Sequence, residues 1–277
     1  MSLVNFRALN DLSYWHALAP DLTVGETAKP PTPQVDTDLQ SIADDLRVHG
    51  YFRVAPVFHE AEMVPLRNAL DALRAAQLPP VFIYVFDQPW ALFRKLSPLI
   101  QYFLSEQFAL LPNFWAWNIP LESGSRGWPP HQDCQAATRF SSGDDQVLMS
   151  LSLWIPLSDA TIHNGCMSVL PRHLSDQVTR EGTIPDQVMA QAVDLPASSG
   201  SVLGWTQDLY HWSNHVTDQA ERPRMSLSLE FQNPAFAPLA EPLLDLSQTP
   251  SFTERLDLIT RQIPKYAHME SLKYDTS

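Results

Sequence analysis

Two stretches in the second half of the chain alternate between apolar residues and small or polar ones. Successive side chains of a strand point to opposite faces, so residues 147–155 and 224–231 each predict a strand with one apolar face. The opposite faces carry Leu148, Ser150, Ser152 and Trp154 in the first strand, and Arg224, Ser226, Ser228 and Glu230 in the second. Such faces are solvated in most half-buried sheets. If helices cover the apolar faces, however, the serine-rich faces line the mouth of a barrel-like fold, where small side chains leave room for a ligand.

The first half of the chain is patterned for helices. Apolar residues recur at helical spacing from Leu39 to Leu46, behind Asp36 or Thr37 as cap candidates, and Gly50 ends the element. This pattern predicts a helix that opens the folded part of the chain.

Further elements follow in the same half. Residues 51–57 predict a strand, and residues 60–77 predict a second helix in which Pro65 is tolerated in the first turn. A third helix is predicted over residues 91–111.

After residue 112 the chain changes to short β-rich runs separated by Gly, Pro and Asn, which favours an antiparallel sandwich or barrel. We therefore expect one domain preceded by an arm. The Pro-rich N-terminal arm is predicted over residues 1–36 and the domain over residues 37–277. Within the domain, residues 37–112 form the helical part and residues 113–232 the β core, which includes a long connection typical of a lid at residues 172–199. Residues 233–277 form a C-terminal wrap with a helix near residues 252–261.

Composition narrows the class of protein. The 277 residues carry a net charge of -13, which opposes binding to nucleic acid or to an anionic membrane. Two cysteines, Cys134 and Cys166, are too few for a disulfide framework, and they are expected to be free thiols. The chain has no apolar run of the roughly 18 residues that a membrane span needs. Its start lacks a signal-peptide pattern, so the expected location is the cytoplasm.

The segment His131-Gln132-Asp133 has the pattern of a metal site. Residues i and i+2 of an extended segment point to one side, so His131 and Asp133 can hold one ion, with His211 as a third ligand later in the chain. Structural zinc sites instead close their shell with four ligands, usually cysteine-rich. Two histidines and one carboxylate with open positions are typical of non-haem Fe(II) oxygenases.

Four blocks of sequence, in order, are similar to one family. The blocks are Leu46 to Phe52, Pro130 to Asp133, Trp154 through Asn164-Gly165-Cys166 to Pro171, and Gly200 through His211 to Arg224. Over residues 38–232 the chain resembles the phytanoyl-CoA dioxygenase family of Fe(II)- and 2-oxoglutarate-dependent oxygenases. The resemblance implies a mainly β fold with flanking helices: a double-stranded β-helix, or cupin-like jelly roll, packed against the N-terminal helices.

The resemblance also implies a ligand set. His131, Asp133 and His211 take the metal-ligand positions, and they are the expected catalytic centre. His215 competes with His211 for the third position, but Ser213 and Asn214 follow His211 as in the family's His-x-Ser segment.

A second group of residues is expected to bind the cosubstrate. Arg224, 13 residues after His211, matches the family's arginine that holds the distal carboxylate of 2-oxoglutarate, and a planar guanidinium suits that task. Arg222 is the alternative, although it precedes Pro223, which interrupts a ladder. Ser213 is expected to add a hydroxyl to the same carboxylate, and Trp154 to line its pocket.

By this resemblance the chain is a dioxygenase that uses Fe(II), 2-oxoglutarate and O2 and hydroxylates a C–H bond of a small organic metabolite, with succinate and CO2 as coproducts. The acidic charge favours a neutral or cationic substrate. Pro171-Arg172-His173 departs from the family's usual Pro-Gly-Ser-His and alters the loop beside the substrate entrance. Two other hypotheses stay open: a cupin-like metalloenzyme that does not use 2-oxoglutarate, and a non-catalytic jelly-roll binding module.

Overall fold

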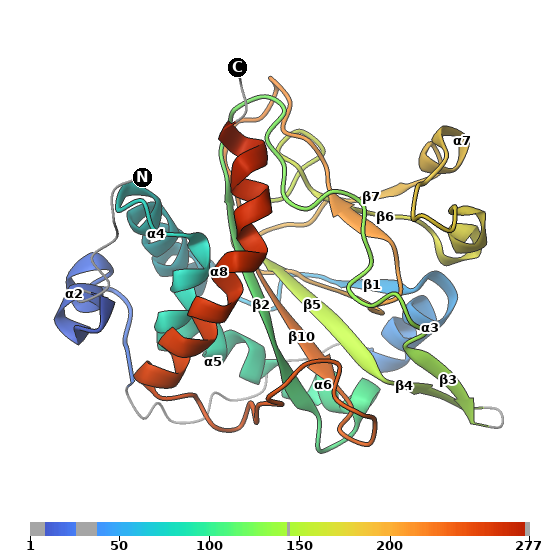
Figure 1. Cartoon of the computed structure of the whole chain (residues 1–277), viewed down its shortest axis with the longest axis horizontal. Helices are drawn as coiled ribbons and strands as arrows, with labels where there is room; N and C mark the ends of the chain where they lie inside the picture. Colours follow the sequence, from blue (N-terminus) through green and yellow to red (C-terminus); the bar gives the residue numbers. More distant parts are fainter. Residues whose placement is uncertain (1–8, 26–37, 143–144, 275–277) are drawn as a thin grey trace.

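Most helices lie in the first part of the chain and most strands in the second, although the long helix α8 follows the last strand (Figure 1). The computed structural model describes residues 9–25, 38–142 and 145–274. Its helices are α2 (Leu12–Leu18), α3 (Leu39–His49), α4 (Glu60–Ala75), η1 (Pro80–Val85), α5 (Asp87–Lys95), α6 (Ser97–Leu104), η2 (Arg172–Gln177), α7 (Asp186–Met189) and α8 (Phe252–Tyr274). Its strands are β1 (Tyr51–Val54), β2 (Ala109–Ile119), β3 (Arg139–Ser142), β4 (Asp145–Leu148), β5 (Ser150–Pro156), β6 (Met167–Val169), β7 (Val193–Leu195), β8 (Val202–Trp205), β9 (His211–Ser213) and β10 (Arg224–Gln232).

The strands form two principal antiparallel sheets and a hairpin. The larger sheet has the order β1-β8-β5-β10-β2, the smaller has the order β7-β6-β9, and β3 pairs with β4. In the described part of the chain the two sheets do not join into a closed barrel. This is the expected jelly roll with flanking helices, in an open form.

Helices cover one face of the larger sheet. Leu151, Leu153, Leu227 and Leu229 pack there in the main hydrophobic core together with residues of α4, η1, α5 and α6. Figure 1 shows α8 running beside β2 on the same side. The opposite face of the sheet, which carries the serine residues, looks toward the smaller sheet. Of the two alternatives for the polar faces, the structure favours the second: helices cover the apolar faces, and Trp154, Arg224, Ser228 and Glu230 of the polar faces line a cavity.

The first predicted helix forms as α3, with a different cap. The Asp38 carboxylate accepts hydrogen bonds from the backbone N–H groups of Gln40 and Ser41 at 3.1 and 3.2 Å, which satisfies N–H groups that have no partner within the helix. Gly50 ends the helix in the left-handed region at φ 88°. The cap candidates Asp36 and Thr37 lie outside the described residues.

The predicted helix over residues 91–111 is correct only in part. The chain forms α5 and α6, which break at Leu96, and then enters β2 at Ala109. Nearly every residue of β2 is buried. A strand covered on both faces lacks the polar alternation that distinguishes it from a buried helix.

Three other predictions need correction. The alternating stretch 147–155 is two strands, β4 and β5, interrupted at Met149. Pro65 lies in the second turn of α4, since that helix begins at Glu60. The C-terminal helix α8 begins at Phe252 as expected but continues to Tyr274.

The two segments outside the predicted core have structure of their own. In the predicted N-terminal arm, α2 buries Trp15, whose indole N–H donates to the Leu9 carbonyl at 2.9 Å. The predicted lid, residues 172–199, contains η2, α7 and β7, and its Leu174 and Val188 pack against Trp212. Among the described residues, no helix is both long and apolar enough to span a membrane.

Gly200 lies just before β8, against the segment that follows β1, and its conformation excludes a side chain. Its φ is +80°, and a Cβ would lie 2.4 Å from the Phe58 carbonyl oxygen. We expect Gly200→Ala to lower the free energy of unfolding by about 1–2 kcal/mol for the left-handed backbone and by about 1–3 kcal/mol more for the clash.

Gly124→Ala is the matched control for this prediction. Gly124 has φ +86°, but no atom lies within 4 Å of the position that a Cβ would take, so only the backbone cost applies. Urea unfolding measures both variants. Equal losses of stability would contradict the proposed clash with Phe58.

Candidate metal centre and cavity

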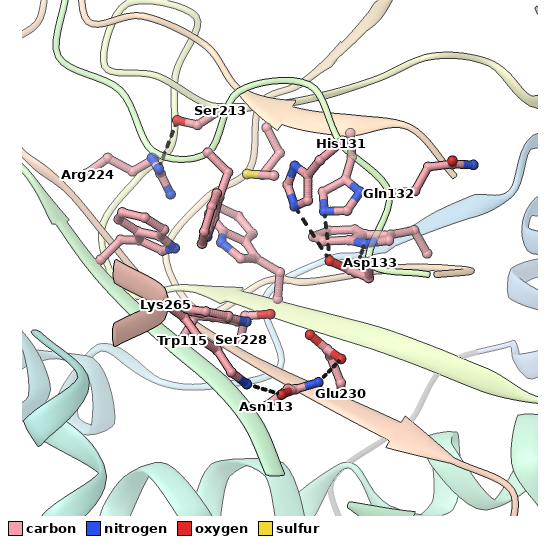
Figure 2. A pocket seen from close by; sticks show the side chains of 16 residues that line it. Asn113, Trp115, His131, Gln132, Asp133, Ser213, Arg224, Ser228, Glu230 and Lys265 are labelled. Carbon is pink, nitrogen blue, oxygen red and sulfur yellow. Dashed lines mark hydrogen bonds and ion pairs between the residues drawn. The ribbon is translucent and has the colours of Figure 1, made fainter. Parts of the chain in front are cut away.

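Three side chains that are distant in sequence converge on one point. The Asp133 Oδ1 atom lies 3.6 Å from the Nε2 atoms of both His131 and His211, and one donor atom from each residue lies within 4.8 Å of the others. Figure 2 shows His131 and Asp133 in this group at one side of a cavity. A metal ion needs such a cluster of donors, and these are two imidazoles and one carboxylate.

Hydrogen bonds orient each of the three donors. The Nδ1 atoms of His131 and His211 lie 2.8 and 3.0 Å from the carbonyl oxygens of Pro129 and Leu209. A carbonyl oxygen cannot donate, so Nδ1 carries the proton and the Nε2 lone pair of each ring is turned toward the cluster.

The second oxygen of Asp133 is held from two strands. Its Oδ2 accepts hydrogen bonds from Ser152 Oγ at 2.7 Å and from Trp205 Nε1 at 3.1 Å. Neither donor was identified from the sequence, although Ser152 belongs to the polar face predicted for its strand. The two contacts leave Oδ1 to face the histidines.

The ionisation of Asp133 and His211 suits metal binding. Burial lowers the pKa of His211 to about 4, which keeps this imidazole neutral. Burial raises the pKa of Asp133, but His211 and His131 outweigh it, so the pKa lies below the usual range and the carboxyl is ionised. Ligands must be deprotonated to bind a metal ion, as these two are.

The local backbone brings the donors together without a long strand. His131 lies in the connection between β2 and β3 and forms a two-way backbone bridge with His211, at 3.1 and 2.9 Å. The extended segment expected at His131 therefore contains a single bridge. Gln132 also lines the cavity, and its amide donates to the Asp208 carbonyl at 2.6 Å.

Arg224 is a buried cation at another part of the same cavity. The side chain is 1% exposed. Its Nη1 donates to Ser226 Oγ at 2.9 Å and its Nη2 donates to Ser213 Oγ at 3.0 Å. No ion pair joins Arg224 to a described carboxylate. Its guanidinium carbon lies 5.6 Å from the Trp154 ring centre. Burial lowers its pKa to about 10, so the group is charged at neutral pH. A buried charge of this kind requires an anion.

The sequence alternatives lie elsewhere. Arg222 is exposed on the connection before β10, where its carbonyl accepts from Asn164, and His215 is exposed two residues after Ser213. Neither lines the cavity, whereas Arg224, Ser213, Trp154 and the three metal-donor residues all do.

Glu230 provides a buried acid at a third part of the cavity. It is 6% exposed, and its Oε2 accepts from Asn113 Nδ2 at 3.1 Å and from Gln207 Nε2 at 3.0 Å. Burial and the charge of Asp133 raise its pKa to about 8. Sequence reasoning placed Glu230 on the correct strand face but gave it no role, because one acid in an alternating strand carries no signal of its own.

Aromatic rings form the remaining walls of this cavity of about 270 Å³. Trp115 and Trp117 meet Trp128 edge to face, with ring centres 5.3 and 6.2 Å apart, and Trp128 lies 5.6 Å from His131. The volume lies just below the roughly 300–1,000 Å³ usual for ligand sites, so the cavity suits small molecules.

Comparison with known families now identifies the chain. The family model for phytanoyl-CoA dioxygenase (PhyH) matches residues 77–225, more than half of the sequence. The chain belongs to the phytanoyl-CoA dioxygenase family. It is therefore an enzyme of the Fe(II)- and 2-oxoglutarate-dependent oxygenase type. A comparison with curated proteins finds no match.

Solved structures share the fold of this phytanoyl-CoA dioxygenase family member. The nickel complex of the non-haem monooxygenase ThoJ has 18% identity, a TM-score of 0.56, and coverage of 82% of this chain and 96% of its own. HygX from Streptomyces hygroscopicus, with nickel and 2-oxoglutarate, has 15% identity, a TM-score of 0.53, and coverage of 73% and 89%. The epimerase SnoN, with Fe3+, alpha ketoglutarate and nogalamycin RO, has 17% identity, a TM-score of 0.53, and coverage of 70% and 83%. At these identities the likeness concerns the fold.

The family's cofactors are Fe(II), the cosubstrate 2-oxoglutarate and O2, and the residues present fit them. The two imidazoles and one carboxylate are a donor set that Fe(II) accepts with coordination positions left open. The uncompensated Arg224 guanidinium fits a cosubstrate carboxylate.

Proposed function

We propose that this protein is a dioxygenase that hydroxylates an unactivated C–H bond of a small organic metabolite, with 2-oxoglutarate converted to succinate and CO2. The observation that carries the proposal is the pairing, in one cavity, of a three-donor metal cluster with a buried guanidinium that has no described counter-anion. A binding module or a cupin-like enzyme without 2-oxoglutarate gives no reason to keep that guanidinium buried, since burying an uncompensated charge is costly.

In the proposed mechanism His131, Asp133 and His211 hold the iron. Ser152 and Trp205 fix the Asp133 carboxylate, and the Pro129 and Leu209 carbonyls fix the imidazole rings. Fe(II) with bound 2-oxoglutarate supplies the means to activate O2 for removal of a substrate hydrogen atom.

Arg224 and Ser213 bind and orient the distal carboxylate of 2-oxoglutarate. Ser226 holds the other side of the guanidinium, and the guanidinium carbon lies 5.6 Å from the centre of the Trp154 ring. A buried bidentate pair both strengthens binding and fixes the cosubstrate's direction toward the metal cluster.

An anaerobic absorbance titration of the Fe(II)-loaded protein with 2-oxoglutarate tests the assignment through the visible charge-transfer band of the iron chelate. We expect a saturable band in the wild type. In Arg224→Ala the cosubstrate affinity should fall by about 2–5 kcal/mol, on the order of 30-fold to several-thousand-fold, because a buried carboxylate loses its partner.

Arg222→Ala is the matched control, since it removes an exposed arginine two residues away and should leave the titration unchanged. A loss of affinity in Arg222→Ala instead would move the role to that residue. Absence of the band from protein with iron demonstrably bound would contradict the use of 2-oxoglutarate. The product is then tested for one added oxygen atom from O2, which separates hydroxylation from the epimerisation named for SnoN.

A further inference from the structure

Glu230 is a second buried ionisable group of the cavity. It and Arg224 lie on the same face of β10, six residues apart, and both are buried and line the cavity. No ion pair joins Glu230 to any described lysine, arginine or histidine. Burial and the charge of Asp133 raise the pKa of Glu230, and the attraction of Lys265 offsets this only in part. The two residues therefore call for ligand groups of opposite charge.

Glu230 lies at the metal side of the cavity. In the register of β10 and β5 it is opposite Ser152, the residue that holds Asp133, while Ser228 is opposite Trp154. Directly opposed residues have Cβ atoms about 4.5–5.5 Å apart. A group bound at Glu230 is thus adjacent to the metal cluster and separate from Arg224 and Ser213.

The surroundings of Glu230 are built to keep it in place. The register of β10 with β2 shifts between Leu229 and Phe231, and such irregularities re-aim side chains. Asn113, from β2 at this shift, donates its amide to Glu230, while its oxygen accepts from Lys265 Nζ at 2.5 Å. An ammonium group cannot accept, so this contact fixes the Asn113 amide with its NH2 toward Glu230. Figure 2 shows Lys265, Asn113 and Glu230 along the same side of the cavity.

One ammonium group already lies at this part of the cavity. Lys265, an exposed residue of α8, places its Nζ 5.8 Å from the Trp115 ring centre without reaching Glu230. Trp117 and Trp128 continue the aromatic wall, and aromatic faces attract cations. The combination of a buried carboxylate with aromatic faces is suited to a ligand ammonium group.

We propose that the substrate is a small amine, an inference that rests on the proposed function. The protonated amino group of this substrate binds Glu230 beside the ring of Trp115. This contact presents a neighbouring C–H bond of the substrate to the metal centre. The ammonium group of the substrate is the counter-charge for the Glu230 carboxylate, just as the carboxylate of the cosubstrate is the counter-charge for the Arg224 guanidinium. The assignment concerns substrate selection, so it makes Glu230 a specificity-determining residue.

The test compares n-propylammonium chloride with n-propanol, which have the same number of heavy atoms but differ in charge. Each is titrated calorimetrically, without O2, into protein loaded with Fe(II) and 2-oxoglutarate, up to about 100 mM because ligands of so few atoms bind in the range of about 0.1–10 mM. We expect the ammonium ion to bind at least about 10-fold more tightly than the alcohol. Equal binding, or no binding of the ammonium ion, overturns the proposal.

Glu230→Gln keeps the shape of the side chain and should abolish the preference for the ammonium ion. Glu181→Gln, an exposed substitution of the same kind, should not. Lys265→Gln keeps a hydrogen-bond donor for Asn113 but removes a positive charge that repels the ammonium ion. This variant should therefore bind the ammonium ion several-fold more tightly than the wild type. It provides an independent test in case Glu230→Gln does not fold. Weaker or unchanged binding in Lys265→Gln counts against the site.

The iron chelate band is recorded in the same samples. A normal band without preference for the ammonium ion contradicts the amine site alone. Absence of the band contradicts the proposed function itself, and with it the amine site.

Discussion

Asp133→Ala is expected to lose iron-dependent turnover and more than about 100-fold in Fe(II) affinity. Asp133 is the anionic donor of the cluster, and its Oδ1 lies 3.6 Å from both imidazoles. Removing a residue that merely supports a ligand typically costs 10–100-fold, so removing the ligand itself should cost more. Competition with a coloured chelator measures iron affinity, and succinate release measures turnover.

Two further variants calibrate this result. Ser152→Ala removes the 2.7 Å hydrogen bond to Asp133 and should weaken iron binding by about 10–100-fold. Asp176→Ala removes an exposed carboxylate outside the cavity and should leave it unchanged. Iron affinity within 10-fold of wild type in Asp133→Ala would exclude Asp133 as a ligand.

Asp87→Ala is expected to lower the free energy of unfolding by about 3–5 kcal/mol, because it leaves a buried guanidinium without its partner. Arg255 is 1% exposed and donates to the Asp87 carboxylate at 2.5 Å, and Thr23 Oγ1 donates to the same group at 2.7 Å. These contacts join the residues before α3 and the start of α5 to α8. Urea unfolding at neutral pH measures the loss.

Asp257→Ala is the matched control, since Asp257 and Arg261 also form a 2.5 Å pair, on the exposed surface of α8. Exposed pairs of this kind contribute about 0.3–0.5 kcal/mol. A similar loss of stability in both variants would show that burial does not set the strength of the Asp87 pair.

The same pair has a defined pH dependence. Burial raises the pKa of Asp87, but the hydrogen bonds from Thr23 and Arg255 outweigh it, so the pKa is lowered in the folded protein. The stabilisation is therefore fully present above the unfolded-state value of about 3.9 and is lost as pH falls below it. Below about pH 4, the wild type should lose stability more steeply than Asp87→Ala.

The strands that could be predicted from the alternating pattern of the sequence are those with one face in the hydrophobic core and the other face on the cavity. β10 and most of β5 have helices on one side and the cavity on the other, so their composition alternates. β2 is buried on both faces, and its first residues, 109–111, were assigned to the preceding helix. The interruption at Met149 was not predictable either, because both halves of that stretch keep the same alternation while they pair with different partners.

At the site, the order of histidine, aspartate and arginine residues along the chain was enough to predict the metal-donor residues. It was not enough to predict which other side chains contact them. His131, Asp133 and His211 were predicted as one cluster, and the structure brings them together. Trp205, Asn113 and Lys265 were missed. Their roles depend on the register of the sheet and on the position of α8, and no local pattern of the sequence records either one.

Helix α8 contacts both the helical layer and the cavity. Arg255 bonds to the Val85 carbonyl and to Asp87, Gln262 donates to the Pro112 carbonyl of β2 at 2.8 Å, and Lys265 reaches Asn113. These three residues span about 15 Å of one helix, given a rise of 1.5 Å per residue. A protein shortened ahead of α8 would thus lose the counter-charge of Asp87, a tether on β2 and one wall of the cavity at once, so truncation at this end would impair stability and ligand binding together.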